Sequence, residues 1–168
     1  MPRVRLKRAS NLLTRAHAGR SSGTKAEWAL VWGSVQTFTK EFPEGAVAIG
    51  GVAVYLRSVE SKRKDLTIEF THDADFLVDK TAWSTIRELF AVTKNERLRK
   101  YQIEIDGVEF DLYLQKTHSL RVDFEDLFMY SSVIKGVRVA SAQHLVILKL
   151  GAFQERRTSE HGAKDRRD

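Results

Sequence analysis

The order of apolar and polar positions along the chain predicts that helices and strands alternate. From about Thr24 to Thr39 the apolar residues recur at helical spacing, which is typical of a helix with one buried face, and Pro43 lies beyond its end. This apolar stripe consists of Trp28, Val31, Trp32, Val35 and Phe38. Both tryptophans are therefore expected in the core, and not as platforms on which bases stack.

The middle of the chain predicts two buried strands separated by a helix. The apolar run from Ala46 to Ile49 predicts a short strand. The pair Gly50-Gly51 predicts a turn, and a helix is expected from Val52 to Val59. The polar stretch from Glu60 to Asp65 predicts a loop, and a second strand is expected from Leu66 to Val78.

The second half of the chain predicts a helix, a β-hairpin and a C-terminal helix. The apolar face of the first helix consists of Trp83, Ile86, Leu89 and Phe90. Asp106-Gly107 lies between the segments 101–105 and 108–114, in which apolar and polar residues alternate, and this predicts a tight hairpin turn. Ser141 is expected to cap a helix that runs towards Arg157. The predicted order is α-β-α-β-α-β-β-α, so the fold class is α/β (α+β), a mixed β-sheet flanked by helices.

The composition fits one folded domain. The chain has 168 residues, of which 42% are hydrophobic, and a chain of this length buries roughly 70% of its unfolded surface. The absence of cysteine excludes disulfides, thiolate zinc sites and cysteine nucleophiles, and it fits a reducing compartment. No apolar run approaches the ~20 residues that span a bilayer, and no signal-peptide core is recognisable. We therefore expect a cytoplasmic protein with no membrane partner.

The positive charge is concentrated at the N-terminus. The formal net charge is +6, and no acidic residue precedes Glu27. The basic residues before it are Arg3, Arg5, Lys7, Arg8, Arg15, Arg20 and Lys25. This segment is consistent with a solvated tail, with an arm that binds a polyanion, or with an organellar transit peptide. We therefore divide the chain into a basic N-terminal arm, residues 1–23, and a folded domain, residues 24–168.

Two carboxylates interrupt the apolar strand predicted to end at Val78. Asp73 and Asp75 are two residues apart, so their side chains point to the same face of a strand. Two like charges about 4 Å apart repel by about 1 kcal/mol in water and by roughly 4 kcal/mol at a surface-like dielectric. A divalent cation removes this repulsion, and oxygen ligands suit Mg²⁺ or Mn²⁺. The pair therefore predicts a metal site beside the glycine turn.

The hairpin supplies a third carboxylate. Between Val108 and Leu114 the apolar residues occupy the even positions, so Glu109, Asp111 and Tyr113 share the opposite face. Alone, Asp111 is read as the polar face of a half-buried strand. If this strand adjoins that of Asp73 and Asp75, the three acids complete a cluster that can hold two metals and support phosphoryl or nucleotidyl transfer.

These residues resemble the DNA polymerase β-type nucleotidyltransferase superfamily. The segments that carry the resemblance are Ile49–Val54, Thr71–Val78 and Phe110–Leu112. The run from Val139 to Ala152, with a later arginine and Lys164-Asp165, is similar to the AbiEii/MenT-like nucleotidyltransferases of toxin–antitoxin systems. The resemblance covers about Val47 to Asp168, and it implies that residues 24–168 form a nucleotidyltransferase domain.

The resemblance also implies chemistry, namely magnesium-dependent transfer of a nucleoside monophosphate from a nucleoside triphosphate with release of pyrophosphate. It implies that Asp73, Asp75 and Asp111 are the catalytic and metal-binding residues. Asp111 would ligate the catalytic metal and accept the proton of the attacking hydroxyl. The residues implied to bind the nucleotide are Gly50, Gly51, Lys149, Arg156 and Lys164. The glycines would let the backbone approach the triphosphate, and the cations would neutralise its charge.

Two positions depart from the pattern of the family. Glu69 stands where relatives often carry an arginine that contacts the nucleotide, and His144 stands where an acidic residue is common. Replacement cations for that arginine are available nearby, namely Arg57, Lys62, Arg63 and Lys64.

Two functional hypotheses remain after this reading. The first is an enzyme that modifies an RNA, with a tRNA 3′ end as the favoured acceptor and an antitoxin protein as a partner, and small-molecule or protein acceptors are variants of it. The second is a non-catalytic module on the same fold that binds nucleic acid or a partner. A zinc hydrolase built on His72, Asp73 and His118 is disfavoured, because no H-E-x-x-H motif or cysteine supports it.

Overall fold

The computed structural model describes residues 24–61, 70–96, 100–115 and 120–156. The basic arm 1–23, Lys164 and His118 lie outside the described residues, as does most of the loop predicted after Glu60. In the described part of the chain, no helix is long and apolar enough to cross a membrane.

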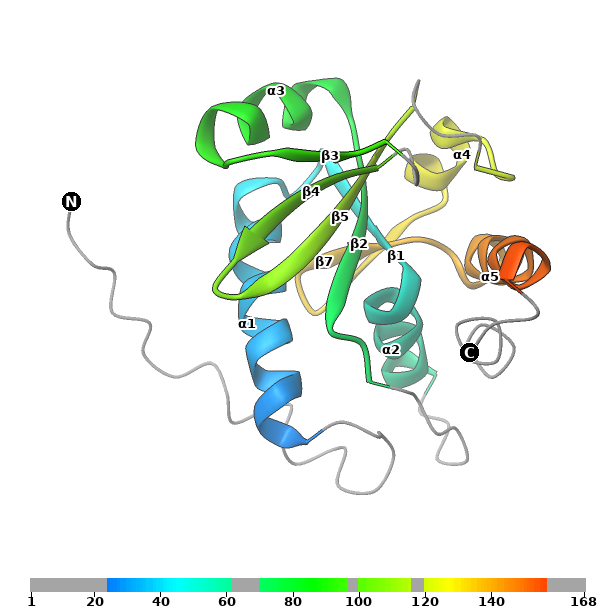
Figure 1. The fold of residues 1–168 in the computed structure, drawn as a ribbon. Coiled ribbons are helices and arrows are strands. Elements are labelled where there is room, and N and C mark those ends of the chain that lie inside the picture. The colour runs from blue at the N-terminus through cyan, green and yellow to red at the C-terminus, as the bar shows by residue number, and fades with distance from the viewer. Residues whose placement is uncertain (1–23, 62–69, 97–99, 116–119, 157–168) are drawn as a thin grey trace.

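The centre of the molecule is one mixed β-sheet with the strand order β3-β4-β5-β2-β1-β7-β6 (Figure 1). The strands are β1 (Ala46–Ile49), β2 (Asp73–Val78), β3 (Thr93–Asn95), β4 (Lys100–Ile105), β5 (Val108–Leu114), β6 (Ser132–Ile134) and β7 (Val137–Val139). The pairs β2–β5 and β1–β7 are parallel, and the other neighbours are antiparallel. The α/β (α+β) class and the mixed sheet flanked by helices are thus confirmed.

The described helices begin at polar caps in most cases. They are α1 (Lys25–Glu41), α2 (Gly50–Glu60), α3 (Lys80–Leu89), α4 (Phe124–Met129) and α5 (Ala142–Arg156). Thr24 and Glu27 form a reciprocal capping box at α1, and the Asp79 and Asp123 side chains cap α3 and α4. The predicted cap of the C-terminal helix is confirmed, because the Ser141 hydroxyl accepts from His144 N at 3.3 Å.

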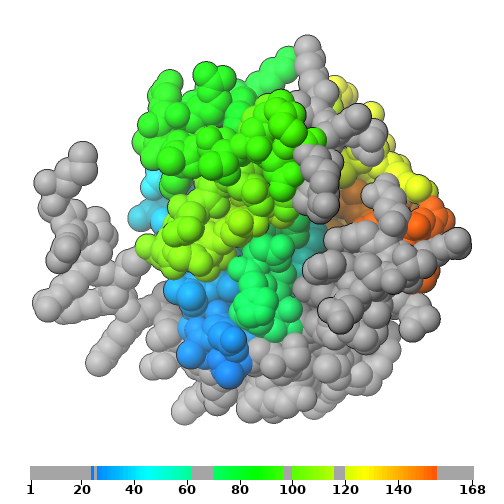
Figure 2. Space-filling view, viewed as in Figure 1, coloured from blue at the N-terminus to red at the C-terminus, as the bar shows by residue number. Residues whose placement is uncertain are grey.

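The helix α1 covers the sheet face opposite to Asp73 and Asp75. Phe38 is fully buried, and its ring centroid lies 4.8 Å from that of Phe76 and 5.1 Å from that of Phe110. Because neighbours along a strand point to opposite faces, this packing directs Asp75 and Asp111 to the other side. In Figure 1, α1 crosses behind the sheet. Figure 2, drawn from the same side, shows residues of α3, β4 and β5 at the surface.

The start of α5 is attached to α2 by one arginine. The Arg57 side chain donates from Nε to the Ala140 carbonyl at 2.9 Å and from a terminal nitrogen to the Val139 carbonyl at 3.0 Å. Val139 is the last residue of β7, and Ala140 lies between it and Ser141, the cap of α5. A planar guanidinium holds both acceptors at once, so it fixes the direction in which α5 leaves the sheet.

Several predicted elements match the structure, and three predictions differ from it. The hairpin is confirmed, with Ile105 opposite Val108 and positive φ at Asp106 and Gly107. The helix predicted from Val52 to Val59 is confirmed, but it begins earlier than predicted, because α2 includes the glycine pair that was predicted to form a turn. The strand predicted from Leu66 is shorter, since β2 begins at Asp73 and 70–72 are not strand.

The third difference is that the predicted order omits short elements. The strands β3, β6 and β7 have three residues each and the helix α4 has six, too few to show a clear apolar period. In α3, Ile86 is buried as predicted, but Leu89 is 58% exposed, so the predicted face is too wide.

Candidate active site

The junction between β1 and α2 is shaped around Asp75. Ile49 pairs with Asp75 across the antiparallel strands, so the next residue, Gly50, lies beside the Asp75 side chain. Gly50 has a φ of +70°, and a Cβ added there would lie 2.1 Å from Asp75 Oδ2. A side chain at Gly50 would therefore displace this carboxylate as well as strain the backbone.

The second glycine leaves room for the residue that orients Asp73. A Cβ on Gly51 would lie 2.8 Å from the Thr71 Cβ and 2.9 Å from its hydroxyl oxygen. Thr71 is buried, and its hydroxyl donates to Asp73 Oδ1 at 2.6 Å. The lack of a side chain at Gly50 thus leaves space for Asp75, and the lack of one at Gly51 leaves space for Thr71, which orients Asp73. Their expected contact with a triphosphate stays a prediction.

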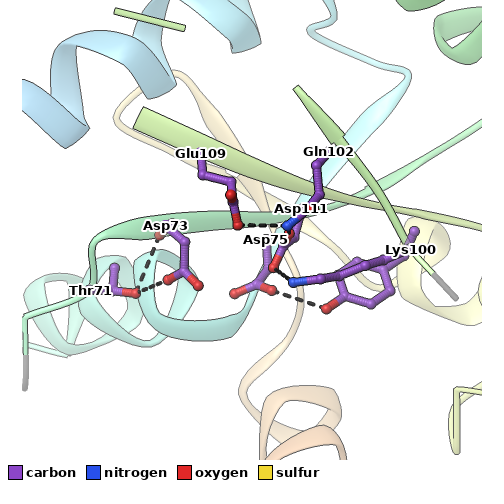
Figure 3. Close-up of polar contacts among 8 residues, drawn as sticks. Thr71, Asp73, Asp75, Lys100, Gln102, Glu109 and Asp111 are labelled. Atoms are coloured by element: carbon purple, nitrogen blue, oxygen red, sulfur yellow. Dashed lines mark hydrogen bonds and ion pairs between the residues drawn. The ribbon is translucent and has the colours of Figure 1, made fainter. Parts of the chain in front are cut away.

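The structure brings Asp111 beside Asp75. The strands β2 and β5 are parallel, with Asp75 opposite Asp111 and Asp73 opposite Glu109. Figure 3 shows these four acidic side chains on the same side of the sheet. Asp111 is 2% exposed, whereas Asp73 and Asp75 are half-buried and Glu109 is exposed. The juxtaposition on which the proposed chemistry depends is therefore present, and the roles of the three residues stay predictions.

Two residues of β4 bind the carboxylate of Asp111, and neither was predicted from the sequence. The Lys100 ammonium forms an ion pair with Asp111 Oδ2, and Gln102 Nε2 donates to Asp111 Oδ1 at 3.0 Å. Gln102 also donates to Glu109 Oε1 at 2.6 Å. Both oxygens of Asp111 therefore have partners from the neighbouring strand (Figure 3).

The register of the β4–β5 hairpin predicts the contact of Lys100 and Gln102 with Asp111. A two-residue turn at Asp106-Gly107 pairs residues whose numbers sum to 213, which places Gln102 opposite Asp111. Lys100 is two residues before Gln102, so its side chain points to the same face. The contact could therefore have been derived from the predicted hairpin, without knowledge of the rest of the sheet.

The electrostatics of the site show a shortage of positive charge. Burial and, to a smaller extent, the charges of Asp73 and Asp111 raise the pKa of Asp75 from its ordinary value to about 7, while the charges of Lys149 and Lys100 oppose this shift. The Tyr113 hydroxyl donates to Asp75 Oδ1 at 3.3 Å. Burial and the neighbouring carboxylates also raise the pKa of Tyr113, so this hydroxyl keeps its proton and acts as a donor.

The predicted cations are placed to different degrees. Lys149 is half-buried on α5, and its charge lowers the pKa of Asp75, so the helix brings it to the acidic side of the sheet. Arg156 is the last residue of α5, and Lys164 lies outside the described residues. The contribution of these two to nucleotide binding stays a prediction.

The donor set fits a divalent ion held mainly by two carboxylates. Among the described residues, no group of three or more acidic or histidine side chains is arranged to hold a metal ion. Lys100 and Gln102 already bind the oxygens of Asp111, which leaves Asp73 and Asp75 as the available pair. Mg²⁺ is commonly bound through one or two carboxylates together with substrate phosphates. The raised pKa of Asp75 is consistent with a site that accepts positive charge.

The same architecture occurs in a solved structure. A proposed nucleotidyltransferase from Thermotoga maritima matches with a TM-score of 0.55 and 18% sequence identity, over 84% of this chain and 94% of that chain. The chain has the nucleotidyltransferase fold. The acidic side of β2 and β5 is thus the candidate active site of a nucleotidyltransferase fold.

A second solved structure matches with a lower TM-score. The Megavirus polyadenylate synthase matches with a TM-score of 0.39 and 12% identity, over 79% of this chain and 30% of that chain. No protein family and no curated protein matches the sequence.

Proposed function

We propose that this chain transfers a nucleoside monophosphate from a nucleoside triphosphate to an acceptor hydroxyl. The observation that carries the proposal is the register of β2 and β5, which aligns Asp75 with Asp111. Burial of Asp75, together with repulsion from Asp73 and Asp111, raises the pKa of Asp75 to about 7. A cluster that is unfavourable when empty is typical of a site that binds cations, and the fold supports the same class of activity.

The cation that fits is Mg²⁺ or Mn²⁺, with Asp73 and Asp75 as its protein ligands. When bound, the ion would neutralise charge on the triphosphate and on the leaving pyrophosphate. Thr71 orients Asp73 by its hydrogen bond, and Tyr113 and Gly50 orient Asp75. These neighbours hold the two carboxylates in place before any ligand arrives, which lowers the cost of binding.

The reaction requires a proton acceptor and cations at the phosphates. A bond forms between the acceptor oxygen and the α-phosphorus, the bond to the bridging oxygen of the β-phosphate breaks, and pyrophosphate leaves. We assign Asp111 as the carboxylate that receives the hydroxyl proton. Gly50 and Gly51 would admit the triphosphate, and its charge would be opposed by Lys149, Arg156 and Lys164.

We propose an RNA as the acceptor, with a tRNA 3′ end as the favoured case. The support is the acid-free basic segment before Glu27, which suits a polyanion. The resemblance to AbiEii/MenT-like proteins supports a role as the toxin of a cytoplasmic toxin–antitoxin pair, with an antitoxin protein as a partner.

The test is incubation of the full chain with each α-labelled nucleoside triphosphate, Mg²⁺ and total RNA. We expect labelled RNA with wild-type protein, and loss of at least 100-fold for Asp73→Asn and Asp75→Asn, because each removes a ligand charge. Glu104→Gln is the matched control, since Glu104 is an exposed acid on β4, and it should keep full activity.

Two results would contradict the proposal. Transfer that persists in Asp75→Asn would exclude a catalytic role for this carboxylate. If no labelled acceptor forms while triphosphate and Mg²⁺ still raise the melting temperature, the chain is a binding module on the same fold.

A further inference from the structure

Lys100 is a half-buried cation that the proposed reaction does not use. It is the first residue of β4, and its side chain is 11% exposed, while that of its partner Asp111 is 3% exposed. Taking two such charges out of water is costly, and removing only one partner leaves an uncompensated charge. The Lys100–Asp111 ion pair is therefore an integral part of the site and is not an incidental surface contact.

The position of Lys100 matters because of what surrounds Asp111. Asp111 Oδ1 is bound by Gln102 at 3.0 Å, and the ammonium of Lys100 binds Oδ2. Asp75 lies opposite Asp111 in the sheet, and the charge of Lys100 also reaches Asp75. Figure 3 shows Lys100 extending from β4 toward these two carboxylates. The positive charge of Lys100 thus already lies beside Asp111, the third acid of the cluster.

We propose that Lys100 is a built-in cation that takes the place of a second metal ion at Asp111. The site then binds one divalent ion, at Asp73 and Asp75, where three free carboxylates would bind two. This inference rests on the proposed function, because it presumes the ion at Asp73 and Asp75. It replaces the expectation that Asp111 ligates the catalytic metal, and it makes Lys100 a positioning residue that acts through Asp111.

The test counts the ions bound by the full chain. Mn²⁺ alone is titrated into the protein, and free Mn²⁺ is measured by electron paramagnetic resonance. We expect about one ion per chain for wild type and about two for Lys100→Met, because the vacated carboxylate becomes a ligand. Lys100→Arg retains the charge and should stay at one ion. The control is Lys94→Met, since Lys94 is exposed on β3 and pairs with Glu96.

The number of ions bound in the titration tests the proposed role of Lys100 directly. Two ions in wild type, or one ion in a folded Lys100→Met, would overturn it while leaving the proposed transferase intact. No ion bound by wild type would overturn the metal site itself, and this inference with it. A purely structural role of Lys100 would change the melting temperature without changing the number of ions.

A second variant guards against misfolding of Lys100→Met. The double variant Lys100→Met/Asp111→Leu removes both charges together, which is tolerated far better than removing one. We expect it to fold, as judged by circular dichroism, and to bind one ion. A second ion in this double variant would show that Asp111 is not the extra ligand and would overturn the inference.

Discussion

At the scale of single residues, two glycines and a threonine determine where the acids point. Gly50 is needed both for its positive φ and for the space that Asp75 occupies, and Gly51 is needed for the space that Thr71 occupies. The family resemblance implies that both glycines lie against the triphosphate. The structure adds a reason that holds without any ligand, because the side chains that touch these glycines are Asp75 and Thr71.

Alanine substitutions at Gly50 and Gly136 separate the need for a positive φ from the need for space beside Asp75. Gly50→Ala should lower stability by roughly 2–3 kcal/mol and abolish transfer, because the backbone is strained and Asp75 must move. Gly136→Ala is the matched control, since Gly136 has a φ of +81° and open space around it. It should cost about 1 kcal/mol and leave transfer unchanged. Urea unfolding and the labelled-transfer assay measure both. Equal losses of stability in the two variants would mean that the Asp75 contact is unimportant.

The raised pKa of Asp75 gives a second prediction at this scale. A carboxyl group whose folded-state pKa is raised from 3.8 to about 7 contributes stability that is present at low pH and is lost as pH rises through 7. In metal-free buffer we therefore expect wild type to lose up to roughly 4 kcal/mol between pH 4 and pH 8 relative to Asp75→Asn. Urea unfolding in EDTA at several pH values measures the difference.

A neutral control checks that the effect belongs to Asp75. Asp106→Asn changes an exposed turn residue with positive φ, a conformation that asparagine tolerates. Its stability should follow the wild-type pH profile. If Asp75→Asn also runs parallel to wild type, the pKa of Asp75 is not raised and the cluster carries no excess repulsion.

At the scale of elements, the long and regular ones could be predicted from the sequence. The stripe of α1 is confirmed by the burial of Val31, Trp32, Val35 and Phe38. The β4–β5 hairpin followed from the turn residues Asp106-Gly107. The β6–β7 hairpin was missed although its turn, Lys135-Gly136, also has positive φ at both positions, because a lysine is not a usual turn residue there.

The candidate site could be predicted only in part. The shared face of Asp73 and Asp75 follows from strand alternation alone, but their approach to Asp111 depends on the parallel pairing of β2 with β5. Local patterns do not specify which distant strands become neighbours. The same limit hid the place of Lys149, whose helix is positioned by Arg57 and the end of β7.

The link between α2 and α5 can be tested through Arg57. Arg57→Lys should lower stability by about 1–3 kcal/mol and reduce transfer several-fold, because one ammonium cannot reproduce the forked contact with two carbonyls. Arg87→Lys changes an exposed arginine on α3 and should alter neither quantity. Thermal unfolding and transfer kinetics provide the readouts. Unchanged kinetics in Arg57→Lys would show that α5 does not position a functional side chain.

At the scale of the whole molecule, charge is divided between the two parts of the sequence. The folded part concentrates acids on one side of β2 and β5, while the segment before Glu27 contains basic residues and no acidic ones. An acidic centre favours cations and repels a polyanion, so a separate basic segment would be a physical means of retaining the RNA acceptor that we propose.

Removal of residues 1–23 tests this division. A protein that begins at Thr24 should bind RNA more weakly and with a smaller dependence of affinity on salt, since six basic residues are lost. Its melting temperature with Mg²⁺ and triphosphate should not change. Filter binding at several salt concentrations measures the affinity. Equal affinity for RNA with and without the segment would assign it to the class of solvated tails.

The ion pair of Lys100 with Asp111 also bears on how the chain reaches its native state. The two residues are eleven positions apart within one hairpin, and such nearby segments meet at a lower entropic cost than distant ones. Asp75 joins them only when the parallel pairing of β2 and β5 forms. The pairing of β2 with β5 therefore brings Asp75 to a carboxylate that already has an ammonium partner, and Lys100 reduces the acid–acid repulsion that opposes this long-range contact.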